Sequence, residues 1–258
     1  MEASTTLYPA VLLEPPPPAP PAPPAALLQP PEPAPVDPAA LPGMFDLVLR
    51  APWRLDEIVR CEAALPAVVQ RLLALSVAGL CVHGLTVGTA ALLLHGHGLD
   101  FYQRGLPPLW MAVAFPLAFL GALSICLPSF YFYTQLSGLD ASFRLITAQA
   151  LRVQATTSVL LLGVLPFYAA WALGAGLGLF GFAPSTVLFA GMALPFVVGF
   201  AGIRALHRSF TALARHLPRT HERRGAFLRR MVLCWGVVYS AIAPVALYRL
   251  AEALGSAL

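Results

Sequence analysis

The chain has 258 residues, of which 58% are hydrophobic and only 11% are charged, whereas a typical soluble domain has roughly 25% charged residues. A water-soluble monomer of this composition would expose apolar patches larger than such proteins tolerate, so the composition excludes an ordinary soluble domain. The formal net charge of +4 reflects 16 basic residues against 12 Asp and Glu, and every basic residue is arginine. This bias, with abundant Ala, Gly, Leu and Pro, is typical of high-GC bacterial coding.

Residues 1–43 form a proline-rich tail that contains fifteen of the 26 prolines, including the run Pro15 to Pro18. Proline lacks an N–H and fixes φ, so we predict a disordered or polyproline-type cytoplasmic segment. A spacer is favoured over a ligand for aromatic-groove modules, because no Arg or Lys flanks the run. Residues 1–14 lack the basic start of a signal peptide, so we expect the first span to direct insertion.

Residues 44–63 have amphipathic character. Leu55, Ile58 and Val59 share one helical face, and the other face carries Arg54, Asp56, Glu57 and Arg60. Pro52 suits the first turn of a helix. We predict a helix lying in the membrane interface, with Trp53 at headgroup depth. Packing of this helix against the cytoplasmic side of the bundle is the alternative.

Residues 64–258 hold five apolar runs that show no polar face at helical period. We predict spans over residues 72–94, 108–133, 155–180, 184–206 and 231–250. Each run has the ~20 apolar residues that a helix needs to cross about 30 Å of hydrocarbon. The predicted fold is therefore an all-α, polytopic transmembrane helical bundle with five spans.

The arginines are distributed unequally between the two sides of these spans. Four precede the first span, two lie between the second and third, and seven follow Arg204 before the fifth, whereas Arg104 and Arg249 lie on the other side. Cytoplasmic segments carry the arginine excess in membrane proteins. We therefore predict a cytoplasmic N-terminus and an extracytoplasmic C-terminus, without a nucleic-acid partner.

The connection between the fourth and fifth spans is the most charged stretch. Its candidate contact residues are Arg204, Arg208, Arg215, Arg219, Arg223 and Arg224. A basic amphipathic segment at a membrane attracts anionic lipid, at about 1 kcal/mol per Arg near the surface. Contact with an acidic protein, or a role confined to setting the topology, are the alternatives.

His83 lies in the middle of the first predicted span, and Gly84 and Gly88 follow it as a GxxxG pair. Ionisable residues at this depth are rare and often functional. Because no Asp, Glu or Arg lies in the middle of a predicted span, a proton relay would have no partner. We favour a neutral imidazole that hydrogen-bonds across helices, and glycines that allow close packing within the bundle rather than dimerisation.

The other candidate sites do not favour catalysis. His95, His97 and Asp100 lie in the sequence HGHGLD, whose glycines leave metal ligands unanchored. The four cysteines form no CxxC pair, which disfavours a zinc site or a disulfide framework. P-loop, HExxH and GxSxG motifs are missing from the sequence. We therefore predict no catalytic, cofactor-binding or metal-binding residues and no enzymatic activity.

Two short stretches accompany this layout: Ala51-Pro52-Trp53-Arg54 before the first span, and Leu139 to Arg144 (LDASFR), followed by Pro166 within the third. With these stretches, residues 50–250 resemble the Yip family of Rab-interacting membrane proteins and its bacterial relatives. The resemblance implies five spans, an outside C-terminus and a role in membrane organisation or trafficking through protein contacts, with no catalytic residues to transfer. The long Arg-rich fourth connection departs from that layout.

The sequence thus favours a non-enzymatic scaffold or interaction protein of a bacterial inner membrane, with membrane lipids and an unidentified protein as partners. The alternative is a transporter or permease subunit, since Pro116, Pro166, Pro195 and Pro244 can kink the spans. A polar path through the spans would favour transport. An intramembrane enzyme is least favoured, because the predicted spans contain no paired carboxylates.

Overall fold

The computed structural model describes residues 43–94, 107–136, 141–181, 183–214 and 222–257, which fold into helices without a strand. Two short helices, α1 (Met44–Arg50) and α2 (Pro52–Arg60), precede a 3₁₀ turn, η3 (Glu62–Ala64). The long helices are α3 (Leu65–Leu93), α4 (Pro107–Leu136), α5 (Phe143–Gly176), α6 (Pro184–Ala214) and α7 (Glu222–Ala257).

Contacts divide the chain into Met1–Pro35 and Val36–Leu258, and every described residue belongs to the second unit. The predicted proline-rich tail therefore lies outside the described residues, except for Gly43.

Each of the five long helices is long and apolar enough to cross a membrane, which confirms the predicted all-α transmembrane fold. The helices mostly extend beyond the apolar runs, and α5 differs most, because it begins at Phe143 rather than near residue 155. At its other end α5 stops at Gly176, before the predicted end of the span at residue 180. The Ser142 side chain caps this helix by accepting a hydrogen bond from the Leu145 N–H at 3.3 Å. Such a cap starts a helix independently of where the apolar segment begins. The orientation of the termini stays a prediction.

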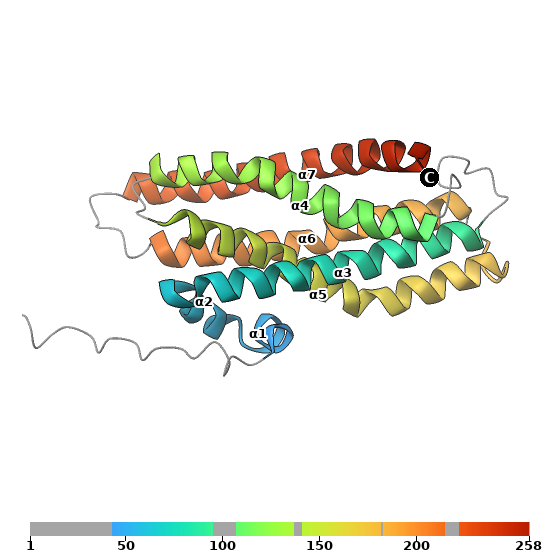
Figure 1. The fold of residues 1–258 in the computed structure, drawn as a ribbon, viewed down its shortest axis with the longest axis horizontal. Coiled ribbons are helices and arrows are strands. Elements are labelled where there is room, and N and C mark those ends of the chain that lie inside the picture. Colours follow the sequence, from blue (N-terminus) through green and yellow to red (C-terminus); the bar gives the residue numbers. More distant parts are fainter. Residues whose placement is uncertain (1–42, 95–106, 137–140, 182, 215–221, 258) are drawn as a thin grey trace, which may run out of the picture. The chain divides into compact units, whose positions relative to one another are not determined.

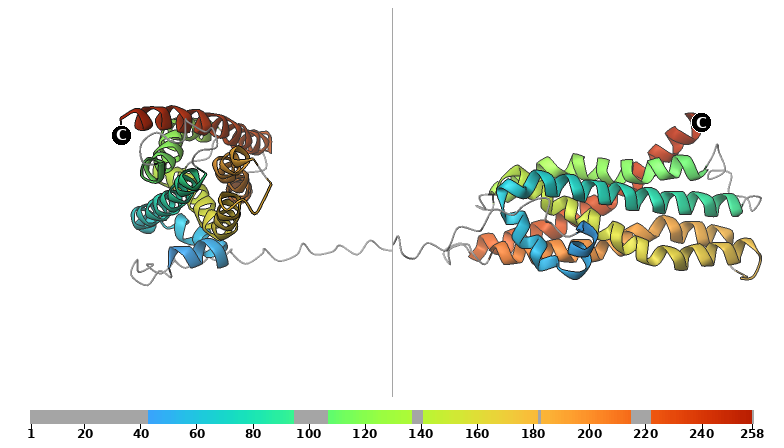
Figure 2. Two further views of the ribbon diagram at one scale, coloured as in Figure 1. Left: turned by 90° about the vertical axis from the view of Figure 1, so that its right-hand side faces the viewer. Right: turned by 60° about the horizontal axis from the view of Figure 1, so that its bottom comes forward.

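The five long helices form a ring. α3 packs between α4 and α5, α6 packs on α5, and α7 closes the ring by contacting both α4 and α6. Successive long helices run in opposite directions (Figure 1). The view along the helices shows the ring order (Figure 2, left). As a result, α3, α5 and α7 begin at the end of the bundle where α4 and α6 finish.

The short helices α1 and α2 pack on the outside of this ring, against α3 and α5. The chain breaks between them at Ala51, because Pro52 disfavours helical backbone at the preceding residue and supplies no N–H. The predicted segment 44–63 is thus two helices and a 3₁₀ turn. Leu55 and Val59 are fully buried, so the apolar face of α2 rests on the bundle. Its depth in a bilayer stays a prediction.

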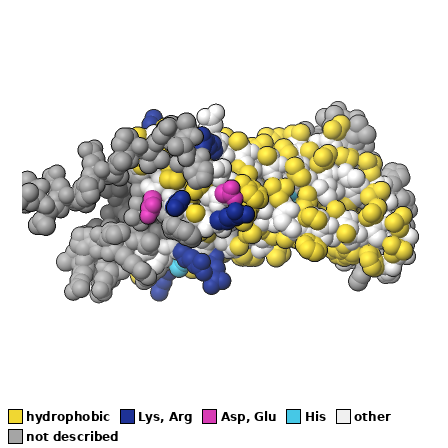
Figure 3. Space-filling model, turned by 90° about the horizontal axis from the view of Figure 1, so that it is seen from below, with side chains coloured by type: hydrophobic (Ala, Val, Ile, Leu, Met, Phe, Trp, Pro, Cys, Tyr) yellow, Lys and Arg dark blue, Asp and Glu magenta, His cyan; other side chains and the backbone are white. Residues whose placement is uncertain are grey.

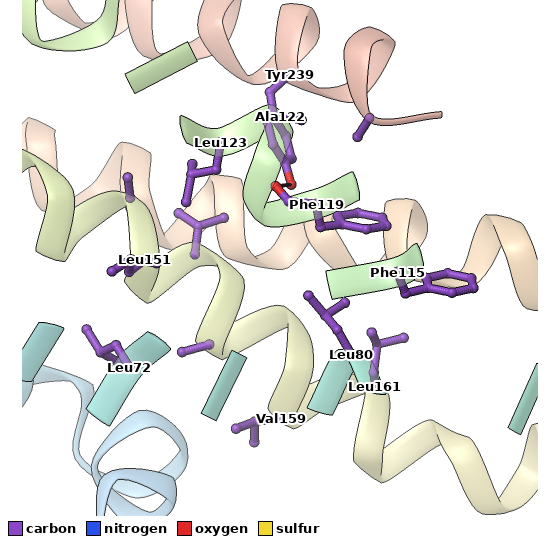
Figure 4. Close-up of a cluster of buried hydrophobic side chains, with 14 of the residues drawn as sticks. Leu72, Leu80, Phe115, Phe119, Ala122, Leu123, Leu151, Val159, Leu161 and Tyr239 are labelled. Atoms are coloured by element: carbon purple, nitrogen blue, oxygen red, sulfur yellow. Dashed lines mark hydrogen bonds between the residues drawn. The ribbon is translucent and has the colours of Figure 1, made fainter. Parts of the chain in front are cut away.

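The core and the outer surface of the bundle are both apolar. Figure 4 shows part of the core, including Leu72, Leu80, Phe115, Phe119, Leu161 and Tyr239, all buried. Outward-facing side chains include Phe167, 78% exposed, Ile125, 72% exposed, and Val237, 71% exposed. Large apolar side chains this exposed are unfavourable in water, whereas lipid solvates them.

Glycines allow neighbouring helices to approach closely. A Cβ on Gly84 would meet the carbonyl oxygen of Met111 on α4, and one on Gly202 would lie 2.9 Å from the carbonyl oxygen of Val153 on α5. Small residues at helix interfaces bring backbones together in membrane proteins. Gly84 therefore serves packing within the bundle.

Candidate functional site

His83 is fully buried on α3 and contacts the backbone of α6. Its Nε2 atom lies 3.0 Å from the carbonyl oxygen of Gly191. A carbonyl oxygen only accepts, so Nε2 is the nitrogen that carries the donated proton. Pro195 stands four residues after Gly191 and has no N–H to offer that carbonyl within the helix. The imidazole of His83 therefore replaces the hydrogen bond that the proline removes.

Aromatic rings from two other helices surround this contact. The ring of Phe115 meets the imidazole edge-on, with centroids 5.0 Å apart, and the ring of Tyr168 lies at 6.5 Å. A Cβ on Gly191 would meet the Tyr168 hydroxyl, so a larger residue here would have to displace the tyrosine side chain. Within the described part of the chain, neither His83 Nδ1 nor the Tyr168 hydroxyl has a hydrogen-bond partner. Four helices thus converge on His83.

A second polar group lies between α4, α5 and α7. Gln154 Nε2 donates to the Tyr239 hydroxyl at 2.6 Å, and that hydroxyl donates to the carbonyl oxygen of Phe119 at 3.0 Å. These residues and Thr157 line a cavity of about 20 Å³, which Phe196 and other residues of α6 also line. A cavity of about 10–15 Å³ is enough for one water. Gln154 Oε1 is buried and has no hydrogen-bond partner among the described residues.

The N-terminal half of α5 carries further buried polar contacts. The Ser158 hydroxyl donates to the carbonyl oxygen of Ser76 on α3 at 3.1 Å. Arg152, only 7% exposed, donates from Nη2 to the carbonyl oxygen of Pro52 at 3.0 Å. The sequence interpretation placed Arg152 in the connection before the third span, whereas the structure places it inside α5, because the Ser142 cap starts the helix earlier.

The six arginines predicted to contact lipid or a partner lie on α6, on α7 or outside the described residues. Arg204 and Arg208 are exposed on the last turns of α6. Arg223 and Arg224 belong to the first turn of α7, whereas Arg215 and Arg219 lie outside the described residues. The described structure therefore places two of these side chains on the surface.

Other arginines lie at the same end of the bundle, where α3, α5 and α7 begin; we call it the arginine end. The described arginines there with assigned exposure include Arg50, Arg54, Arg71, Arg144, Arg204, Arg208 and Arg230. Figure 3 shows arginine side chains gathered toward one end of the visible face, with an apolar surface beyond them. This separation of charge from apolar surface matches the boundary between lipid headgroups and hydrocarbon.

The histidine cluster His95, His97 and Asp100 lies outside the described residues. Within the described ranges, no three His, Cys, Asp or Glu side chains come together to hold a metal. The four cysteines are free thiols, and Cys126 is buried on α4.

The sequence analysis did not identify Gln154, Tyr168 and Tyr239 as members of the buried polar groups between the helices, which we call the polar core. A glutamine or tyrosine within or beside an apolar run is a usable signal, since its polar group needs a partner in the membrane. The partner itself is identified only when the helices are placed side by side.

Comparison with protein-family models, curated proteins and solved structures yields no match for this chain. The resemblance to the Yip family therefore stays a prediction.

Proposed function

We propose that this chain is a non-enzymatic, multi-pass scaffold or interaction protein of a bacterial inner membrane, with its arginine end in the cytoplasm. The observation that carries the proposal is the tight packing of the polar core. The cavity between α4, α5, α6 and α7 measures about 20 Å³, which is room for about one water. A space of this size suits one water rather than a transported solute.

The pairing of the polar groups favours the same conclusion. The imidazole of His83, the hydroxyl of Tyr239 and the guanidinium of Arg152 each bond a backbone carbonyl of another helix. Such contacts hold helices in a fixed arrangement. A rigid bundle with an outward-facing charged end suits a protein that presents a surface to partners.

The arginine end supplies that surface. Arg204 and Arg208 are exposed on α6, and the sequence adds Arg215, Arg219, Arg223 and Arg224 close behind them. A cluster of this charge attracts anionic lipid headgroups or an acidic protein surface. We expect anionic lipid to gather here and a protein partner to bind at the same end.

One observation favours the transporter alternative. Pro195 leaves the Gly191 carbonyl without its helical partner at the position where His83 meets α6. Interrupted helices with free carbonyls near the middle of the membrane form substrate and ion sites in secondary transporters. In this chain the imidazole of His83 bonds the Gly191 carbonyl oxygen, so a transporter would have to break this hydrogen bond to use that oxygen.

Site-specific photo-cross-linking in cells tests the scaffold proposal. A photoreactive amino acid at Arg208 should capture a discrete protein partner, whereas the same probe at Val197, 64% exposed in the middle of α6, should capture lipid. The protein adduct should weaken when Arg204 is replaced by Glu. Capture of lipid alone at Arg208, together with solute uptake by proteoliposomes containing the purified protein, would favour the transporter instead.

A further inference from the structure

Helix α1 has apolar side chains on two sides. Met44, Leu47 and Val48 are buried, whereas Phe45 and Leu49, one turn apart, are 45% and 46% exposed. A helix that is apolar on more than one side is stable when each apolar side is covered. α1 packs against α3 and α5, so the bundle covers one side and the Phe45–Leu49 side needs a different cover.

The surroundings of α1 indicate what this cover is. α3, on which α1 rests, carries exposed apolar side chains such as Leu73 and Val77 on its own outer surface. α1 therefore packs on a helix whose own outer surface is apolar, as a lipid-facing surface is. Figure 3 shows the molecule from below, with the charged side chains toward one end and an apolar surface beyond them.

The charges of α1 and α2 place these helices at the edge of that apolar surface. Asp46 and Arg50 form an exposed ion pair on α1, with Arg50 Nε 3.6 Å from Asp46 Oδ1, and Arg54 is exposed on α2. Charged side chains of this kind require water or headgroups, while Phe45 and Leu49 require hydrocarbon. Both requirements are met together at the boundary between headgroups and acyl chains.

We propose that Phe45 and Leu49 insert into the acyl-chain edge of the bilayer, with lipid phosphates opposite Arg50 and Arg54, so that α1 docks the arginine end onto one leaflet. Amphipathic helices bind membranes in this way, with the apolar face about 5–10 Å deep. Arg152 donates a hydrogen bond of 3.0 Å to the carbonyl oxygen of Pro52. This bond fixes α2 to the bundle, and with it the neighbouring helix α1. The inference rests on membrane embedding of the five long helices and is independent of the scaffold role.

Spin-label accessibility in lipid nanodiscs tests this inference on the full-length chain with its native cysteines replaced. Nitroxides are placed singly at Phe45→Cys, Asp46→Cys and Val237→Cys. We expect the label at Phe45 to be relaxed more by oxygen, which concentrates in hydrocarbon, than by a water-soluble nickel chelate. The label at Asp46, one residue along the same helix, should show the opposite preference. Val237 reports the embedding of α7 itself.

Each other outcome overturns the inference in a distinguishable way. A nickel-accessible Phe45 beside an oxygen-accessible Val237 would place α1 in water while leaving the membrane fold intact. A Phe45 label reached by neither agent would mean that protein, such as a second copy of the chain, covers it. A nickel-accessible Val237 would remove the membrane premise as well. With all cysteines retained, a photoreactive phenylalanine at Phe45 should attach to phospholipid, and attachment to protein would again overturn the proposal.

Discussion

At the scale of single residues, the contact between His83 and Gly191 links two features that stand 108 positions apart in the chain. A proline within a membrane helix leaves a carbonyl without its N–H partner, and lipid cannot replace that partner. The Gly191 carbonyl is in this position because of Pro195. His83 donates the missing hydrogen bond from α3, so the histidine and the proline form one structural unit.

A double-mutant cycle tests this unit. We expect His83→Leu to lower the free energy of unfolding by about 1 kcal/mol, the usual value of an interhelical hydrogen bond in membranes. His83→Asn should lose less, because an amide also donates. Pro195→Ala restores the helical N–H to Gly191, so His83→Leu should cost less in that background. The measurement is detergent-solubilised thermal unfolding.

Two results would contradict this interpretation. Equal costs of His83→Leu in both backgrounds would show that the proline and the histidine act independently. Loss of function in His83→Asn with unchanged stability would favour a transporter, because an amide cannot titrate near neutral pH as an imidazole can.

Gly84 offers a second test at this scale, directed at helix packing. A Cβ on Gly84 would meet the carbonyl oxygen of Met111, whereas a Cβ on Gly163 of α5 would meet nothing within 4 Å. We expect Gly84→Ala to destabilise by about 1–3 kcal/mol, the usual cost of overpacking. The matched control Gly163→Ala should be neutral or slightly stabilising, since alanine is the better helix former. Equal melting temperatures for the two variants would refute the close contact between α3 and α4.

At the scale of elements, α5 is the helix whose buried polar side chains bond several other helices. Its buried side chains Arg152, Gln154 and Ser158 bond α2, α7 and α3 respectively. These contacts come from one half of a single helix, so α5 bonds three other helices through buried side chains. Gly79 matches this role, since a Cβ there would lie 2.5 Å from Ser158 Cβ.

The bond between Arg152 and Pro52 can be tested by the reactivity of Cys61, a free and partly exposed thiol that caps the end of α2. Arg152→Met keeps the length of the side chain and removes the donors, so α2 should loosen and the rate of maleimide labelling at Cys61 should rise several-fold. Arg144→Met, an exposed change on the same helix, is the control. Mass spectrometry of the Cys61 peptide separates this signal from the other thiols. An unchanged labelling rate would show that apolar contacts alone hold α2.

The elements differ in how far the sequence could predict them. The apolar runs indicated all five long helices, because lipid requires about 20 apolar residues from each span. The start of α5 was missed, since a serine cap acts locally and leaves no trace in hydropathy. Pro52 suggested the start of α2 but not the separate helix α1. His83 stood out as an ionisable residue in an apolar run, whereas its partner Gly191 is a backbone group that no sequence pattern marks.

At the scale of the whole molecule, the arginines and the helix directions together determine the expected topology. The described part of the chain brings the starts of α3, α5 and α7 to one end of the bundle (Figure 1), and that end carries Arg71, Arg144 and Arg230. Alternating helix direction thus gathers arginines from distant parts of the sequence on one side. From the positive-inside rule we expect this side to lie in the cytoplasm.

Reporter fusions test this topology. A fusion after Thr220, between α6 and α7, should report the cytoplasm, and a fusion after Leu258 should report the extracytoplasmic side, because α7 alone separates the two points. Thirteen arginines lie in the segments expected inside, against Arg104 and Arg249 outside, so the expected bias is strong. Replacing Arg223, Arg224, Arg229 and Arg230 by Gln should reduce the fraction of correctly oriented C-terminal fusions, since fewer charges then hold that connection inside. If both fusion points report the same side, α7 does not cross the membrane and the five-span topology is wrong.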